Sequence, residues 1–181
     1  MARVTMATLI TRTRVLIGDP VGASQQFSDD QVQDALDAHR TDARQGRLIP
    51  QPTYSAPGSY AFYYDYYAPL PAWESDWIIQ DATRTTVVPA TSDEITGHFT
   101  FTVQRIPPLY ITGKAYDRYG AAVDLIEAWS GAVATQFDFS TDQQDFSRSQ
   151  KQKGLLALAD VYRRRAWPYG GLRLVTADQP W

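Results

Sequence analysis

The feature that most constrains the fold is an abrupt change of composition in the middle of the chain. On either side of the stretch from Pro50 to Gly113, apolar residues recur three and four positions apart, which is typical of amphipathic helices. Within that stretch, prolines, aromatic residues and β-branched residues predominate in short runs separated by turn formers, which predicts short strands. We therefore expect a helical core interrupted by a β-rich insertion.

The flanking segments predict four helices. The first is expected to end at Gly18-Asp19-Pro20, because glycine and proline stop helices. The second opens on Ser28 and Gln31, a capping-box pair, and is expected to run from about Asp29 to Gln45. The third and fourth are expected over residues 117–136 and 147–166.

The predicted strands are short and separated by prolines. They are expected at residues 60–67, 76–80, 85–88, 98–103 and 109–112. The sequence therefore predicts an α+β, mainly helical chain. A four-helix core of residues 1–49 and 114–166 carries a small antiparallel β-rich domain, residues 50–113, inserted between the second and third helices. Residues 167–181 form a C-terminal docking tail.

The sequence offers little for catalysis or for binding a cofactor. The chain has no cysteine, which excludes disulfides, thiolate nucleophiles and cysteine-based metal sites. His39 and His98 lie far apart without metal-ligand spacing, and no nucleophile elbow or phosphate-binding glycine motif occurs. The acidic pairs Asp29-Asp30 and Asp93-Glu94 are explained by a helix start and a turn. We expect no enzyme, no metal and no cofactor.

Charge and hydropathy limit the kinds of partner that the protein can bind. The net charge is −3 and the sequence pI is about 5.3, so the surface as a whole does not favour gripping a phosphate backbone. No segment of the sequence reads as a secretory signal or approaches the length of a membrane span. We expect a protein that is made in the cytoplasm and does not enter a membrane.

Two apolar segments are candidates for protein contacts. The first is the run from Tyr60 to Tyr67, whose tyrosines could pack in the core, form a subunit interface, or stack on bases or sugar rings. The second is the C-terminal tail, whose large apolar side chains predict a segment that covers a surface. The tail residues assigned to this docking are Trp167, Tyr169, Leu172, Leu174, Val175 and Trp181.

The order of these features resembles the head–tail connector proteins, also called adaptor or head-completion proteins, of long-tailed bacteriophages. The resemblance extends over residues 9–166. It rests on the order and co-occurrence of motifs that carry no chemistry themselves. These motifs are Phe27-Ser28-Asp29-Asp30, Tyr63-Tyr64-Asp65-Tyr66-Tyr67-Ala68-Pro69, Thr96-Gly97-His98-Phe99-Thr100-Phe101, Tyr110-Ile111-Thr112-Gly113-Lys114-Ala115-Tyr116-Asp117, Tyr119-Gly120-Ala121-Ala122, Glu127-Ala128-Trp129, Phe137-Asp138-Phe139-Ser140 and Phe146-Ser147-Arg148-Ser149-Gln150.

The resemblance implies a structural virion protein at the head–tail junction, or neck. Its subunits would form a homo-oligomeric ring, usually of twelve, beneath the portal protein. The ring would extend the DNA channel, retain the packaged double-stranded DNA without sequence-specific binding, and present a docking surface to the next connector layer or the tail-completion protein. The C-terminal tail would engage the portal. The residues assigned to the ring interface are Tyr63, Tyr64, Tyr66, Tyr67, Arg148 and Arg163.

Two alternatives remain open from the sequence. The chain could be a tail-completion or tail-terminator ring subunit on the tail side of the same particle. It could also be a binding module that uses the tyrosine run to hold a glycan or single-stranded nucleic acid.

Overall fold

The structure is a computed structural model of the chain. It describes residues 1–55, 60–134, 139–141, 144–146, 148–167 and 175–176, and for 139–141, 144–146, 148–149 and 175–176 it describes the backbone alone. In chain order the elements are η1 (Val4–Met6), α1 (Ala7–Ile17), α2 (Asp29–Ala38), β1 (Arg40–Arg47), β2 (Ile49–Tyr54), β3 (Ala61–Tyr67), β4 (Ile78–Asp81), β5 (Thr91–Asp93), β6 (His98–Thr100), β7 (Leu109–Tyr116), α3 (Arg118–Ala134), β8 (Phe139–Thr141), β9 (Gln144–Phe146), α4 (Arg148–Arg163) and β10 (Val175–Thr176).

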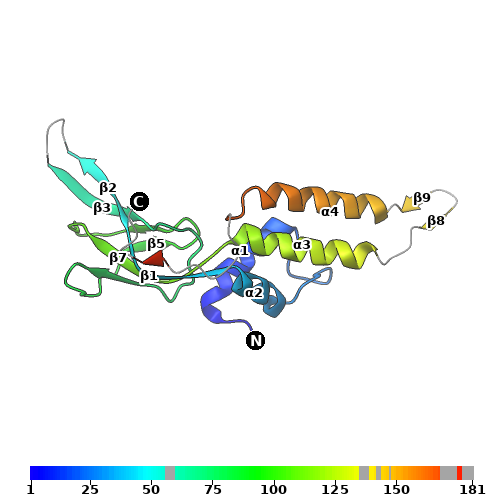
Figure 1. The fold of residues 1–181 in the computed structure, drawn as a ribbon, viewed down its shortest axis with the longest axis horizontal. Helices are drawn as coiled ribbons and strands as arrows, with labels where there is room; N and C mark the ends of the chain where they lie inside the picture. Colours follow the sequence, from blue (N-terminus) through cyan, green and yellow to red (C-terminus); the bar gives the residue numbers. More distant parts are fainter. Residues whose placement is uncertain (56–59, 135–138, 142–143, 147, 168–174, 177–181) are drawn as a thin grey trace. The chain divides into compact units, whose positions relative to one another are not determined.

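The chain divides into two compact units, and Figure 1 shows the elements of each. We call the described residues of 1–39 and 117–167 the helical unit, and residues 40–116 together with β10 the β-rich unit. The helical unit is therefore assembled from two segments of the chain that are far apart in sequence.

Two helix boundaries in the helical unit lie where the sequence predicts them: the end of α1 and the beginning of α2. Gly18 ends α1 in the left-handed conformation, with φ 68°, and its N–H donates to the carbonyl groups of Arg14 and Val15. Ser28 begins α2 with the predicted capping box: its hydroxyl accepts from the N–H of Gln31 at 3.2 Å, and the Gln31 side chain accepts from the N–H of Ser28 at 2.7 Å. Both predicted boundaries are confirmed.

Helix α3 is at the centre of the helical unit, because it packs against α1, α2 and α4. Its buried face carries small and branched apolar side chains, which allows close approach of three neighbours. The buried apolar residues of the helical unit are Met6, Leu9, Ile10, Ile17, Val32, Leu36, Ala121, Ala122, Val123, Leu125, Ile126, Val133, Leu155 and Ala159.

The β-rich unit contains two four-stranded sheets, ordered β10-β1-β7-β4 and β2-β3-β6-β5. All pairs are antiparallel except β1 with β10, which is parallel. The central strand β7 aligns Tyr116 with Arg40 and Gly113 with Ala43, and the register then shifts by a β-bulge before Gly46. The largest fully buried side chains of this unit are Trp73, Tyr66, Tyr116, Phe99, Leu48, Ile79, Leu109 and Ile111.

The expectation of a mainly helical chain on a four-helix core is wrong. The chain is α+β, and the strands form two full sheets with a core of their own. The second helix was expected to reach Gln45, but it ends at Ala38 and residues 40–47 form β1. Thr41 and Ala43 point inward and alternate with half-buried neighbours, a period-two pattern that β7 makes stable by supplying hydrogen bonds.

Several other boundaries differ from the prediction. Residues 85–88 form no strand but contact β4 through the Gln80–Thr86 bridge, whereas Thr91–Asp93, where no strand was expected, forms β5. Strands β2, β8, β9 and β10 were also not predicted. The third and fourth helices, expected over 117–136 and 147–166, run over 118–134 and 148–163; residues 135, 136 and 147 lie outside the described residues.

Candidate docking surfaces

The tyrosine run does not form one surface, because its members differ in burial. Tyr66 has no exposed side-chain area, and its ring meets Phe101 edge-on at 5.7 Å between centroids. Its hydroxyl donates to the carbonyl group of Arg105 at 2.7 Å, and burial raises the pKa of Tyr66 to about 12. Tyr66 therefore belongs to the core, although the sequence assigned it to the ring interface.

Tyr67 is the most exposed of the four assigned tyrosines, at 39%. Its ring stacks on His98 on the neighbouring strand β6, with 4.6 Å between centroids and 15° between planes. The His98 Nε2 lies 3.2 Å from the Asp65 carboxylate, which fixes the imidazole. Tyr63 and Tyr64 are half-buried. Tyr67 and His98 thus offer an ordered, partly exposed aromatic pair.

The two arginines assigned to the ring interface lie at opposite ends of α4. Arg163, in its last turn, pairs with Glu127 on α3 and with Asp160. Arg148 is the first residue of α4, and its side chain lies outside the described residues. The structure therefore shows that Arg163 joins the two long helices of its own chain.

The C-terminal tail begins at a buried carboxylate. Asp117 is 4% exposed, and its Oδ2 accepts the backbone N–H of Trp167 at 2.6 Å. Its Oδ1 accepts the N–H groups of Tyr119 and Gly120, the donors left unpaired at the start of α3. Asp117 N–H in turn donates to the carbonyl group of His39. One side chain thus ties the start of the tail to α3.

Further along the tail, Val175 belongs to β10 and aligns with Ala43 on β1, so this part of the tail adds to a sheet edge. The remaining assigned tail residues, Tyr169, Leu172, Leu174 and Trp181, lie outside the described residues. Of the six assigned docking residues, therefore, only Trp167 and the backbone of Val175 are placed.

A buried charged cluster in the β-rich unit was not predicted. Glu74 has no exposed area, and its carboxylate accepts the Tyr116 hydroxyl at 2.7 Å and the Lys114 ammonium at 3.3 Å. A hydrogen bond to Asp76 raises the pKa of Lys114 above its usual value. Lys114 and Tyr116 are two positions apart on β7, so their side chains lie on the same face of the sheet. This spacing is the one feature of the sequence that could have indicated the cluster. Lys114 thus pairs with both carboxylates, and the buried Glu74 carboxylate is satisfied by Lys114 and Tyr116.

A second buried ion pair joins the first two helices. Arg14 is 3% exposed and donates to the Asp19 carboxylate at 2.8 Å, to the Asp29 carboxylate at 2.7 Å and to the carbonyl group of Phe27. Asp19 also accepts the N–H groups of Gln26 and Phe27. The planar guanidinium suits three acceptors at once, so this network fixes the loop between α1 and α2.

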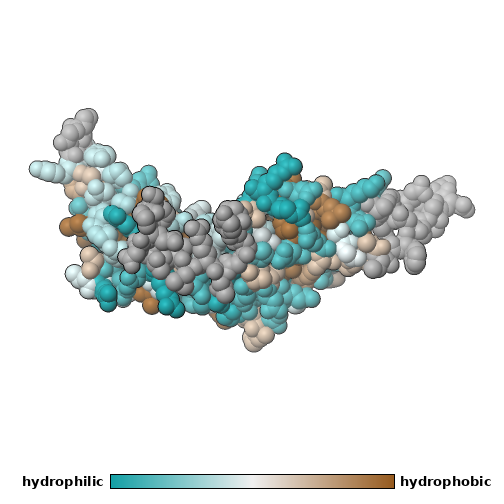
Figure 2. Space-filling model, in the orientation of Figure 1, coloured by the Kyte–Doolittle hydropathy of each residue, from teal (hydrophilic) through white to brown (hydrophobic). Residues whose placement is uncertain are grey.

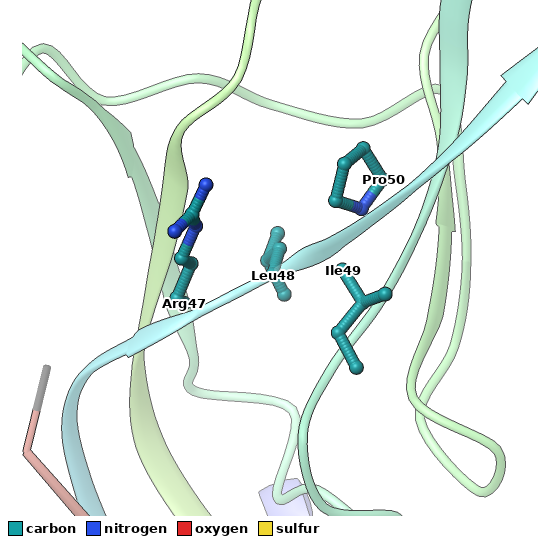
Figure 3. A pocket seen from close by; sticks show the side chains of 4 residues that line it. All are labelled: Arg47, Leu48, Ile49 and Pro50. Atoms are coloured by element: carbon teal, nitrogen blue, oxygen red, sulfur yellow. The ribbon is translucent and has the colours of Figure 1, made fainter. Parts of the chain in front are cut away.

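Two hollows of the surface lie in the β-rich unit. One has a volume of about 310 Å³, lies where β1 passes into β2, and is lined by Arg47, Leu48, Ile49 and Pro50. In Figure 3 the Arg47 and Pro50 side chains extend to one side of the strand and Ile49 extends to the other. The other has about 210 Å³ and is lined by Gln45, Gln80, Asp81, Ala82, Arg84 and Tyr110. The four residues of the first hollow include one titratable side chain, that of Arg47.

The part of the chain that the structure describes contains no group of three or more histidine and acidic residues that could hold a metal ion. His39 is held instead by Asp124, with 2.8 Å between Nε2 and Oδ2. None of the helices formed by the described residues is long and apolar enough to cross a membrane.

Comparison with known proteins gives no relative. Neither a family model, nor a curated protein, nor a solved structure matches the chain. Inferences about its function therefore rest on its own residues and on the order of its motifs.

Proposed function

We propose that the chain is a structural subunit of the head–tail connector of a long-tailed bacteriophage. It assembles into a ring beneath the portal, extends the DNA channel and presents a docking surface for the tail. The observation that carries this proposal is the order of elements that the resemblance names: a helix ending at Gly18, a capped helix starting at Ser28, a β-rich unit, then the α3–α4 hairpin.

Two features of the structure support the proposal. The first is that the helical unit is compact although it is built from two segments of the chain, one before and one after the segment that forms the β-rich unit. The second is that the tail starts from the fixed point between Asp117 and Trp167. A segment with a fixed start and a large apolar content can order on a partner surface at a lower entropic cost than a free terminus.

The first test is the mass of the purified protein by light scattering, alone and mixed with purified portal rings of the same phage. We expect the subunits to join the portal in a fixed multiple. A protein that never binds portal would refute the connector assignment. A hexameric ring that binds the tail tube would support a tail-completion subunit, and salt-dependent retention on single-stranded DNA or polysaccharide would support a binding module.

The second test addresses the tail. A truncated chain that ends at Trp167 keeps the hydrogen bond between Trp167 and Asp117. It lacks residues 168–181, and with them β10 and the other apolar residues of the tail. We expect this variant to stay folded by circular dichroism and to lose attachment to portal rings. A matched control replaces Tyr54 with Ser, which changes an aromatic residue that is 60% exposed and lies outside both the tail and the assigned ring interface, and it is expected to leave attachment intact. Capture of the truncated chain at the level of the full chain would refute the tail's role.

A further inference from the structure

The helical unit carries opposite charges on its two outer helices. Helix α2 contains four acidic residues and no basic one. Residues 148–165, which include α4, contain six basic residues and a single acidic one, Asp160. This separation is pronounced for a chain whose net charge is only −3.

The two charged helices lie on different sides of α3. Helix α3 packs against both of them, and Figure 1 shows α3 between α2 and α4. Val32 and Leu36 are the buried residues of α2, and Leu155 and Ala159 are buried on α4. The opposite faces of these two helices are exposed to solvent. The helical unit therefore has an acidic flank on α2 and a basic flank on α4.

Part of this charge is already paired within the chain. On the acidic flank, Asp29 pairs with Arg14 and Asp37 pairs with Arg3. Asp34 is exposed and has no ion-pair partner among the described residues. The charge left at the centre of the α2 surface is therefore negative.

On the basic flank, too, some charges are paired within the chain and others are not. Arg163 is engaged by Glu127 and Asp160, and Lys151 lies over the Trp129 ring at 4.9 Å. Lys153 and Arg164 are exposed and have no ion-pair partner in the described part of the chain. The surface over α4 is mostly hydrophilic with a hydrophobic patch, as Figure 2 shows, and Leu156 and Val161 are exposed on this helix at 43% and 47%.

We propose that the α2 surface of one copy docks on the α4 surface of the next copy, with Asp34 facing Lys153, while Arg164, about three helical turns further along, adds positive charge to the same surface. Two α2 surfaces repel each other, as do two α4 surfaces, so a symmetric pair of like faces is disfavoured. A contact between different faces of identical subunits is heterologous, and it generates a ring when the rotation closes. Leu156 and Val161 supply apolar area to the contact, while the charges set its orientation. This inference rests on the proposed ring and names the contact that builds it.

The first experiment is zero-length carbodiimide crosslinking of the full chain, which joins carboxylates to lysines. An equal mixture of isotopically light and heavy protein distinguishes crosslinks between copies from those within one copy by mass spectrometry. The chain has three lysines, Lys114, Lys151 and Lys153, so the possible products are few. We expect crosslinks between copies that join Asp34 to Lys153. Crosslinks between copies that involve only Lys114 would overturn the proposal.

The second experiment is charge reversal, read by sedimentation velocity at low ionic strength over a range of protein concentration. Asp34→Lys and Lys153→Glu are each expected to raise the concentration needed for association at least about tenfold, because each places like charges across the contact. The double variant D34K/K153E restores opposite charges and is expected to recover association. Arg84→Glu, which makes a comparable charge change in the β-rich unit, is the control and is expected to have no effect.

Three results would overturn the proposal: a protein that stays monomeric at low ionic strength, oligomers unaffected by either reversal, or a double variant no better than the single variants. Binding to portal rings is measured separately on the same variants. If the subunits still join portal rings in a fixed multiple while the reversals have no effect, the connector assignment survives and the α2–α4 contact is refuted.

Discussion

The Asp117 carboxylate and the backbone N–H of Trp167 are hydrogen-bonded at 2.6 Å, although the two residues are 50 positions apart. The same carboxylate also caps α3 through Tyr119 and Gly120. Because Asp117 is 4% exposed, water cannot readily replace these bonds. The start of the C-terminal tail and the start of α3 therefore depend on one side chain.

Asp117→Ala is expected to lower the free energy of unfolding by about 3 kcal/mol, roughly 1 from the lost helix cap and roughly 2 from the lost charged hydrogen bond to Trp167. The isosteric Asp117→Asn variant can still cap α3 through its oxygen, but its amide group cannot accept the Trp167 N–H. We expect a smaller loss in urea unfolding, with faster proteolytic cleavage after Trp167. An Asn variant as stable as the wild type would show that the bond to Trp167 contributes nothing, and equal losses for the two variants would show that the cap of α3 contributes nothing.

Gly120→Ala is expected to destabilise the protein by about 1–3 kcal/mol through overpacking. An added Cβ would lie 2.6 Å from His39 Nδ1 and 3.0 Å from Asp117 Oδ2, and the His39 ring cannot retreat without losing Asp124. Gly131→Ala on the same helix is the control, because its Cβ would meet no atom within 4 Å. That change is expected to stabilise α3 by up to about 1 kcal/mol in thermal unfolding. Similar effects at the two positions would contradict the close contact at Gly120.

Arg14→Met is expected to lower the free energy of unfolding by about 3–5 kcal/mol, because it leaves the buried carboxylate of Asp19 without its cation. Arg14→Lys keeps the charge but cannot reach Asp19, Asp29 and the Phe27 carbonyl group together. We expect it to recover less than half of the loss, as measured by chemical denaturation. Full recovery by lysine would show that charge alone, without the guanidinium fork, supports this loop.

Tyr66→Phe is expected to cost about 1 kcal/mol at neutral pH through the lost hydrogen bond to the Arg105 carbonyl group. The native pKa of about 12 lies above the unfolded value of 10.0. Between these values only the unfolded state loses the proton, so the contribution of Tyr66 to stability is complete below pH 10 and falls as pH rises toward 12. The stability gap between wild type and variant is therefore expected to narrow by about 1 kcal/mol near pH 11. A gap that stays constant from pH 8 to 11 would contradict the raised pKa of Tyr66.

Much of the helical unit could be predicted from sequence because its signals are local. The capping box at Ser28 and the glycine stop at Gly18 each act within one helical turn, and both stand as predicted. The approximate spans of α3 and α4 follow from apolar residues three and four apart. These features need no information about distant parts of the chain.

The β-rich unit was harder to predict because strand pairing joins distant residues. Residues 40–47 continue past α2 without a strong stop signal, and only the pairing with β7 makes them a strand. Thr91–Asp93 becomes a strand because β6 lies beside it, whereas residues 85–88, which read as a strand, gain a single bridge. Whether such a short segment forms a strand therefore depends on which neighbouring strand it can pair with.

The sequence by itself determined the alternation of helical and β-rich segments, the caps of the early helices and the separation of acidic from basic residues along the chain. Only the tertiary structure decided that Tyr66 is buried while Tyr67 is exposed, that Asp117 accepts the N–H of Trp167, and that the buried Glu74 pairs with Lys114. The physical reason is range. Caps and periodicity act over three or four residues, whereas burial and buried ion pairs depend on contacts between segments tens of residues apart.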